Sequence, residues 1–159
     1  MQEFEGCPGS RMFEFKDKGA EDTEEATGKI ESQLRQWPIQ LHLISPLAPY
    51  YQGADVLLAA DCVAFALGDF HRQFLQGKSI AIACPKLDEG QDIYVEKIKG
   101  WFEEAKINTL TVLIMQVPCC MGLISLAQQA SQASQRKVPI KQVVVGVEGE
   151  ILQEEWVQS

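Results

Sequence analysis

The five cysteines are the residues of this sequence whose type and spacing point most directly to chemistry. Cys62, Cys84 and the pair Cys119-Cys120 follow runs of apolar, strand-forming residues, whereas Cys7 lies near the start of the chain. Thiolates bind soft metals and iron–sulfur clusters, and they also exchange with disulfides. Since an odd number of cysteines does not close into a disulfide framework, the sequence favours free thiols that bind a metal.

Apolar runs that predict strands alternate with segments of helical periodicity through most of the chain. The pattern predicts strands over 39–45, 55–60, 79–83, 108–117 and 142–147, helices over 63–76, 91–106 and 121–136, and a hairpin turn at 148–150 into a last strand. This alternation is typical of an α/β fold. We therefore predict an open, mostly parallel sheet with helices on both faces, a three-layer, Rossmann-like arrangement.

Four of the cysteines fall where predicted strands end. Ligands of open α/β sheets bind in the crevice outside the carboxyl ends of the strands, so these four thiols are expected on one rim. Cys62 and Cys120 also open predicted helices, whose free backbone N–H groups stabilise a thiolate. A single cysteine is often a small buried hydrophobic residue, but four on one rim favour a binding site.

The sequence leaves the kind of thiolate site open. Zinc sites usually show paired C-x₂₋₄-C motifs, and this chain has none. The C-x₂-C-x₂-C-x₃-C run of ferredoxins is absent as well. Widely spaced ligands are compatible with an iron–sulfur cluster held between loops, which is the first hypothesis. A zinc-stabilised interaction domain and a thiol/disulfide redox enzyme using Cys119-Cys120 are the alternatives.

Composition divides the chain into three parts. Residues 1–13 form a predicted stub that contains Cys7-Pro8-Gly9-Ser10, and 14–33 read as an acidic flexible linker because large apolar residues are nearly absent. Residues 34–159 form the predicted cysteine-rich α/β domain. Asp61, Lys86 and Asp88 accompany the cysteines, and loop solvation and capping are their expected roles.

Charge and hydropathy exclude several classes of partner. The net charge of −8 disfavours nucleic acid, because phosphate backbones repel an acidic surface. The sequence contains no run of 18 apolar residues, so no membrane-spanning helix is predicted. The first residues lack the basic and apolar regions of a secretion signal. We expect a cytoplasmic protein, where thiols stay reduced.

The string QLRQWPIQLHLISPLAPYYQGADVLLAADCVAFALGDFH, followed by ACPKLD and VPCC, resembles a known family. It is similar to the carboxyl-terminal domain of prokaryotic 4Fe-4S ferredoxin-type iron–sulfur cluster-binding proteins, a family with few characterised members. The resemblance runs from Cys7 to about Ile151. Two departures are the missing ferredoxin half and Met121, which stands where a glycine is expected.

The resemblance implies a function more specific than the residues alone indicate. It implies a 4Fe-4S cluster, electron transfer in an anaerobic redox system, and a redox protein partner such as a ferredoxin domain or an oxidoreductase subunit. Cys62, Cys84, Cys119 and Cys120 would be the ligands, with Cys7 as a fifth thiol or a replacement. An electron-transfer or metal-binding module is therefore expected rather than a stand-alone enzyme.

Overall fold

The structure is a computed structural model, which describes residues 11–15 and 28–157. Its elements follow the chain as β1 (Phe13–Glu14), β2 (Gln36–Trp37), the 3-10 helix η3 (Pro49–Tyr51), β3 (Asp55–Ala60), α1 (Val63–Ala66), the π-helix η4 (His71–Leu75), β4 (Ser79–Ala83), α2 (Gln91–Glu103), β5 (Thr109–Met115), the 3-10 helix η5 (Pro118–Cys120), α3 (Met121–Ala133), β6 (Ile140–Val145) and β7 (Ile151–Val157). No helix in this part of the chain has the length and apolar character needed to cross a membrane.

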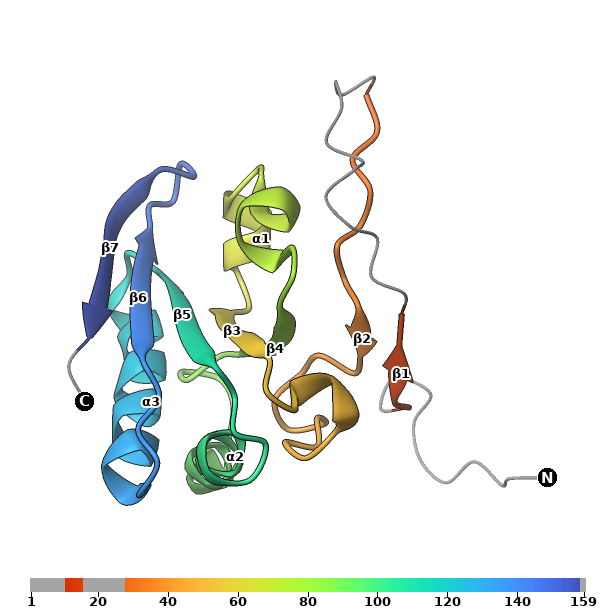
Figure 1. Cartoon of the computed structure of the whole chain (residues 1–159). Coiled ribbons are helices and arrows are strands. Elements are labelled where there is room, and N and C mark those ends of the chain that lie inside the picture. Colours follow the sequence, from red (N-terminus) through yellow and green to blue (C-terminus); the bar gives the residue numbers. More distant parts are fainter. Residues whose placement is uncertain (1–10, 16–27, 158–159) are drawn as a thin grey trace.

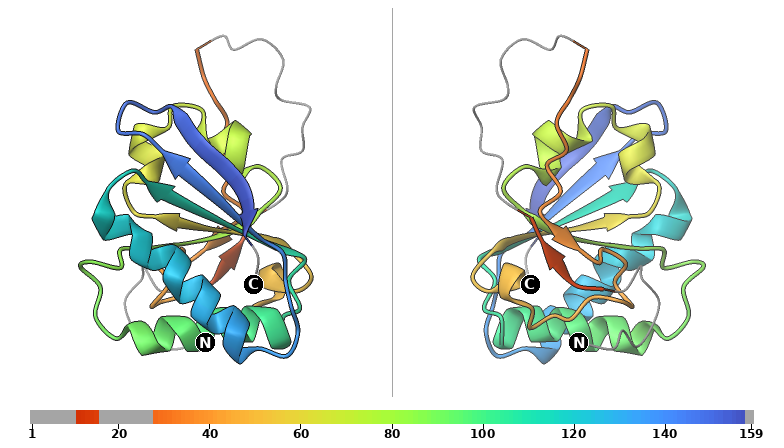
Figure 2. Two further views of the ribbon diagram at one scale, coloured as in Figure 1. Left: turned by 90° about the vertical axis from the view of Figure 1, so that its left-hand side faces the viewer. Right: turned by 90° about the vertical axis from the view of Figure 1, so that its right-hand side faces the viewer.

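Five strands form the main sheet in the spatial order β4-β3-β5-β6-β7. The first four pair in parallel, and β7 returns antiparallel to β6 after the turn at 146–150, as Figure 2 shows. β3 is buried from Val56 to Ala60, so both of its faces are covered. The predicted α/β fold with a mostly parallel sheet is confirmed.

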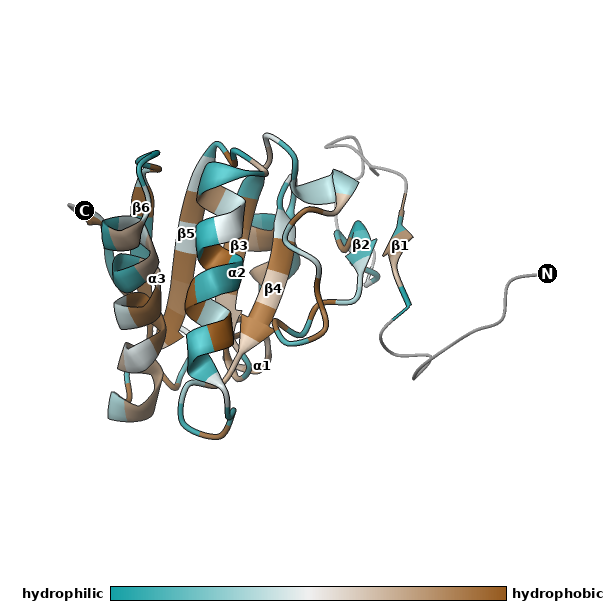
Figure 3. Cartoon of the chain, turned by 90° about the horizontal axis from the view of Figure 1, so that it is seen from below, coloured by the Kyte–Doolittle hydropathy of each residue, from teal (hydrophilic) through white to brown (hydrophobic). Residues whose placement is uncertain are grey.

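The helices cover the sheet from two sides. Helices α2 and α3 lie side by side on one face (Figures 1 and 3), where α2 contributes the fully buried Trp101 and Ile98. The connection from β3 to β4 through α1 and η4 crosses the sheet in the opposite direction. Because parallel crossovers are right-handed, this connection lies on the other face.

The segment from Gln33 to Ile44 runs along the edge of β4. The side chain of Gln36 pairs with both backbone groups of Ile80: Nε2 donates to the carbonyl at 2.7 Å, and Oε1 accepts from the N–H at 2.9 Å. Further on, Gln40 forms a single parallel bridge with Ile82. The leading segment therefore supplies the hydrogen bonds that a further strand would otherwise make.

The predicted strand over 39–45 was wrong. Apart from the bridge at Gln40, this segment is a turn, which the ammonium group of Lys97 holds by donating to three backbone carbonyls, among them those of Leu41 and Ile44. Leu41 and Ile44 are buried and the residues between them are exposed. Leu43, which the alternating pattern places on the buried face with Leu41, is exposed, so the alternation of residue types does not correspond to alternating burial.

The predicted helix over 63–76 is interrupted. Helix α1 ends at Ala66 because Leu67 takes an extended conformation (φ −99°, ψ 101°), and a separate π-helix follows at His71–Leu75. Gly77, with φ of +77°, makes the turn into β4. Residues of both short helices line one pocket, among them Phe65 and Leu75.

The predicted boundaries at 13/14 and 33/34 lie among described residues, but most of the predicted stub and linker do not. The segment Cys7-Pro8-Gly9-Ser10 and residues 16–27 of the predicted linker lie outside the described residues. The described residues Phe13–Glu14 pair antiparallel with Gln36–Trp37.

Candidate functional site

The cysteines lie at the point where the chain changes direction across the sheet. The connection that leaves β3 runs outward to β4, whereas the connection that leaves β5 runs the other way to β6. Such a reversal opens a crevice outside the carboxyl ends of the two central strands. Cys62 follows β3, and Cys119 and Cys120 follow β5, so both sides of the crevice carry thiols. Cys84 follows the neighbouring strand β4.

A pocket of about 220 Å³ occupies this crevice, and all four described cysteines line it. The rest of its lining is Ala60, Asp61, Pro85, Met115, Val117 and Val147. Apart from the thiols and Asp61, the lining side chains are apolar. The structure thus brings Cys62, Cys84, Cys119 and Cys120 to one site, which we call the cysteine pocket. Cys7 lies outside the described residues.

The four thiols differ in how far solvent reaches them. All are free; Cys62 and Cys119 are exposed, Cys84 is partly buried, and Cys120 is buried with 6% of its surface exposed. Met121 is 47% exposed and does not line the pocket, so it does not crowd the site as its replacement of an expected glycine suggested. Three thiols are therefore open to reagents, and the fourth lies behind them.

Burial dominates the ionisation of Cys120. It raises the pKa of the Cys120 thiol, and the neighbouring thiols of Cys119 and Cys62 raise it further. Cys120 directly precedes α3, where a lowered pKa was predicted, but the shift is upward because burial removes hydration from the thiolate. Any metal that binds Cys120 must displace its proton.

The loop that carries Cys84 is built around its own sulfur and backbone. The Leu87 N–H donates to Sγ of Cys84 at 3.4 Å, and the Asp88 N–H donates to the Cys84 carbonyl at 2.9 Å. The Cys84 N–H in turn donates to Oδ2 of Asp88 at 2.9 Å. These hydrogen bonds fix the position of the Cys84 sulfur within the loop.

Asp88 anchors this loop to the rest of the domain. Its Oδ2 also accepts hydrogen bonds from the Tyr94 hydroxyl and from Nε2 of Gln40, the latter at 3.2 Å. Burial alone would raise the pKa of Asp88, but the hydrogen bonds from Tyr94, Cys84 and Gln40, with the nearby His42, outweigh it and lower that pKa. The expected capping role of Asp88 fits this arrangement.

Close backbone contacts set the walls of the cysteine pocket. A Cβ atom at Gly122, in the first turn of α3, would lie 3.1 Å from Cβ of Pro85, so the Cys84 loop packs tightly against that turn. A Cβ atom at Gly149 would lie 2.5 Å from the carbonyl oxygen of Ala66, which fixes the β6–β7 turn beside α1. These contacts hold three loops around one pocket.

Asp61 lines the cysteine pocket beside Cys62, and it is the least satisfied polar group there. Its Oδ1 is buried and has no hydrogen-bond partner within the described residues. Burial, and then the charge of Asp88, raise the pKa of Asp61. Sequence reasoning placed Asp61 on the rim but gave no sign of this unpaired oxygen.

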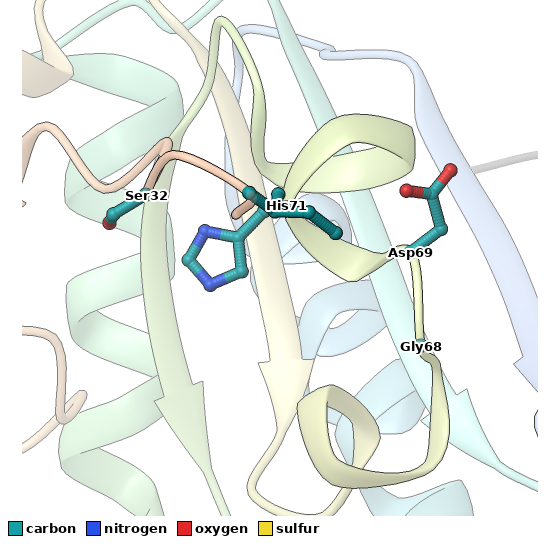
Figure 4. Close-up of a pocket in the computed structure, with 5 residues that line it drawn as sticks. Ser32, Gly68, Asp69 and His71 are labelled. Atoms are coloured by element: carbon teal, nitrogen blue, oxygen red, sulfur yellow. The ribbon is translucent and has the colours of Figure 1, made fainter. Parts of the chain in front are cut away.

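The two histidines lie apart from the thiols. His42 stacks on Tyr94 with ring centroids 4.2 Å apart, and its Nε2 lies within hydrogen-bond distance of the Glu89 carbonyl. Nδ1 of His71 accepts a hydrogen bond from the Gln33 N–H at 3.0 Å. His71 lines two further pockets, one of which is shown in Figure 4, and shares the other with Asp61.

The side chains do not form a closed site for a single ion. Among residues 11–15 and 28–157, no group of three or more His, Cys, Asp or Glu is arranged to hold a metal ion. In a tetrahedral zinc site, Zn–S bonds of about 2.3 Å place the sulfurs about 3.8 Å apart. The thiols share a pocket, but they are not drawn together around one point.

Differences in burial predict an order of reaction with iodoacetamide. Cys62 and Cys119 should be alkylated first, Cys84 more slowly, and Cys120 last. Since only the thiolate reacts, the raised pKa of Cys120 leaves less thiolate at pH 8, and its rate should keep rising at higher pH than that of an ordinary cysteine. Peptide mass spectrometry over a pH series measures this order, and early labelling of Cys120 would contradict its burial.

Comparison with known proteins gives a family for the fold but not an activity. A family model described as a Rossmann-like domain matches residues 48–158. An uncharacterized protein of Archaeoglobus fulgidus is 29% identical over 119 residues, which are 75% of this chain and 83% of that protein. No solved structure matches the chain.

These comparisons correct the family resemblance drawn from the sequence. The matching model is the Rossmann-like domain, the similar archaeal protein carries no functional name, and neither points to a ferredoxin-type 4Fe-4S family. The assignment to that family was wrong. The motifs on which it was based, ACPKLD and VPCC, are the two loops that carry Cys84, Cys119 and Cys120 to the pocket.

Proposed function

The chain belongs to the Rossmann-like domain family, and on this fold we propose that it binds an iron–sulfur cluster through Cys62, Cys84, Cys119 and Cys120. The observation that carries the proposal is the cysteine pocket, in which loops after three different strands present four free thiols. Core packing does not require this arrangement. Thiolate-rich donor sets select iron–sulfur clusters or zinc, and the donor set here is all sulfur apart from Asp61.

The spacing of the thiols favours a cluster over a single zinc ion. A cluster carries its ligands on separate iron atoms, so its thiolates lie farther apart than those around one ion. The four cysteines surround a pocket of about 220 Å³, and no three of the described ligand side chains are arranged to hold a single ion. This arrangement suits the wider spacing of cluster ligands. The Leu87 N–H that donates to Cys84 also matches the hydrogen bonds that tune cluster potentials.

A bound cluster would supply reversible one-electron transfer at this edge of the sheet. The chain's own part is to hold the four thiolates, to keep an apolar wall of Met115, Val117 and Val147 beside them, and to leave Cys62 and Cys119 exposed. Because these two cysteines are exposed, the redox centre of a protein partner could come close to a cluster bound there. Free thiols of this kind fit a reducing compartment such as the cytoplasm.

The test is anaerobic reconstitution of the full chain, in parallel with ferrous iron plus sulfide and with zinc. The expected product is a brown protein with matched iron and sulfide, whose visible absorption dithionite bleaches. Four single variants test the ligands: Cys62→Ser, Cys84→Ser, Cys119→Ser and Cys120→Ser. Each should lose most of the bound iron. Losing a hydrogen-bond partner of a metal ligand already lowers metal affinity about tenfold, and losing the ligand itself should cost at least as much. Cys7→Ser tests whether Cys7 completes or replaces the set.

Other outcomes separate the alternatives. One tightly bound zinc, without iron or sulfide, would contradict the cluster and establish a zinc-stabilised module. If neither metal binds, the site is a dithiol, for which the neighbouring thiols of Cys119 and Cys120 are the candidates. In that case the two thiols give two electrons and two protons to a disulfide substrate: the substrate S–S bond breaks to give two thiols, and a Cys119–Cys120 S–S bond forms. Consumption of a model disulfide, with formation of the protein disulfide, measures the reaction.

A further inference from the structure

The large apolar side chains that are most exposed to solvent stand next to the cysteine pocket. Among the described residues Phe65, Leu87 and Val147 have the three highest exposed fractions of this class, at 91%, 79% and 69%, and Met121 is also exposed. We call these four side chains the apolar collar. A single exposed apolar residue is ordinary, but several of them together on one part of a surface mark a place where another molecule binds.

The collar is tied to the cysteines by the chain itself. Three of its members follow a cysteine of the pocket within three positions: Phe65 follows Cys62, Leu87 follows Cys84, and Met121 follows Cys120. The fourth, Val147, lines the cysteine pocket. The close contacts of the Cys84 loop with the start of α3, and of α1 with the β6–β7 turn, hold the collar in place. Figure 2 shows α1, the start of α3 and the β6–β7 turn along one edge of the molecule.

The charges beside the collar are mostly negative. The Cys84 loop and the β6–β7 turn are described throughout, and they carry three exposed glutamates against one exposed lysine: Glu89, Glu148 and Glu150 against Lys86. The whole chain has a net charge of −8. Complementary charges at the edge of an interface steer a partner into place and speed association. The collar therefore suits a partner with an apolar centre and a basic rim.

The size of the collar favours a short-lived complex. Four side chains make a patch on the order of a few hundred Å², whereas a stable interface takes about 800 Å² from each partner. Weak complexes between redox proteins lie at the low end of interface size. A second copy of this chain would bring the same three glutamates to the contact, so like charges disfavour a dimer there.

We propose that the apolar collar is the docking surface for a redox protein whose cofactor edge lies in an apolar patch surrounded by Lys and Arg. The collar would pack against that patch, and the exposed thiols of Cys62 and Cys119 lie beside it. One electron would pass from the reduced cluster to the oxidised cofactor of the partner. The nature of this partner rests on the cluster proposed above, but the collar belongs to the chain with or without metal, so docking can be tested separately.

The probe is reduced cytochrome c, a redox protein in which lysines surround the exposed haem edge. It is titrated at low salt into the metal-free full chain, and amide chemical shifts of the chain are followed. Saturable shifts are expected at the collar residues, and the affinity should fall at least about tenfold in 0.5 M salt, because salt screens the charges at the rim. No saturable shifts, or shifts centred on another surface, would overturn the proposal.

A double variant separates the collar from charge alone. Phe65→Ser combined with Leu87→Ser should weaken binding of cytochrome c by about tenfold, because apolar contacts at the centre of an interface carry much of its affinity. The control is Leu47→Ser, which is 49% exposed and precedes β3 at the opposite end of the sheet, and it should bind as wild type does. Equal affinity of wild type and the double variant would overturn the proposal. So would dimerisation of the free chain through the collar, or its binding to phosphatidylcholine vesicles.

Electron transfer from the reconstituted protein gives a second readout. The double variant should load iron as wild type does but reduce cytochrome c about tenfold more slowly. Reduction of hexaammineruthenium(III), a small cation that makes no apolar contact, should keep its rate. If the rate with cytochrome c did not change either, electrons would leave by another surface and the proposal would fall. If no cluster forms, the cluster proposal fails, and binding to the metal-free chain still decides whether the collar docks a basic protein.

Discussion

Replacing Asp88 with alanine should destabilise the protein by about 2–4 kcal/mol at neutral pH and remove most of its capacity to load iron. One carboxylate oxygen accepts from the Cys84 N–H, the Tyr94 hydroxyl and Gln40. Hydrogen bonds to a charged group contribute about 1.5–3 kcal/mol each, and their donors lose their partner together. Without Asp88 the loop no longer fixes the sulfur of Cys84 beside the other thiols. Urea unfolding and iron analysis of the reconstituted protein measure the two effects.

The pH dependence gives Asp88→Ala a second signature. Since the pKa of Asp88 is lowered in the folded protein, its contribution to stability is present above the unfolded value of about 3.9 and is lost as pH falls through the folded value. The difference in the free energy of unfolding between wild type and Asp88→Ala should therefore become smaller below about pH 4. Asp92→Ala, at an exposed aspartate, should stay within about 1 kcal/mol of wild type. A gap that stays constant down to pH 2 would mean that Asp88 does not act through its charge.

Replacing Gln36 with alanine should cost about 3 kcal/mol, because the buried N–H of Ile80 loses its partner and the Ile80 carbonyl keeps only the Tyr51 hydroxyl. Gln36 is fully buried, and its amide matches the N–H and the carbonyl of Ile80 as a neighbouring strand would. A buried donor or acceptor left unpaired costs about 1–3 kcal/mol. The variant should also expose the Ile80 amide to hydrogen exchange. Urea unfolding and exchange measured by NMR test both results.

The control for Gln36 is Gln52→Ala, since Gln52 is exposed and makes one hydrogen bond to the Leu47 carbonyl. It should change the free energy of unfolding by less than about 1 kcal/mol. Gln36→Glu separates hydrogen bonding from volume: the carboxylate still accepts from Ile80 but has no proton to donate to its carbonyl. If Gln36→Glu were as stable as wild type, the paired arrangement would not be what holds the leading segment.

The sheet could be predicted from the sequence because its strands carry their own signal. The runs at 55–60 and 79–83 are β3 and β4 with the same bounds, since parallel strands that are covered on both faces are apolar on both faces. The strand predicted over 39–45 was wrong because the segment is held as a turn by Lys97, which is distant in the sequence. A local pattern does not contain such a contact.

Some features of the candidate site could be predicted from the sequence, and others could not. That Cys62, Cys84, Cys119 and Cys120 line one pocket follows from strand order and from the carboxyl ends at which they stand. The ionisation of Cys120 did not follow, because its burial depends on Met115 and Val117 closing around it. The unpaired oxygen of Asp61 also required coordinates. So did the break of the helical pattern of 63–76 at Leu67, which hydrophobic periodicity does not register.

The two edges of the sheet bear on how the protein behaves when it is crowded. An open edge offers unpaired backbone groups to any passing strand, and edge-to-edge addition is a common route to aggregation. One edge, β4, is closed by the chain's own leading segment through Gln36 and Gln40. The other, β7, is exposed and carries Glu154 and Glu155 side by side. Glu154 is paired with Lys141, so Glu155 is the unshared charge that another copy of the same strand would meet at this edge.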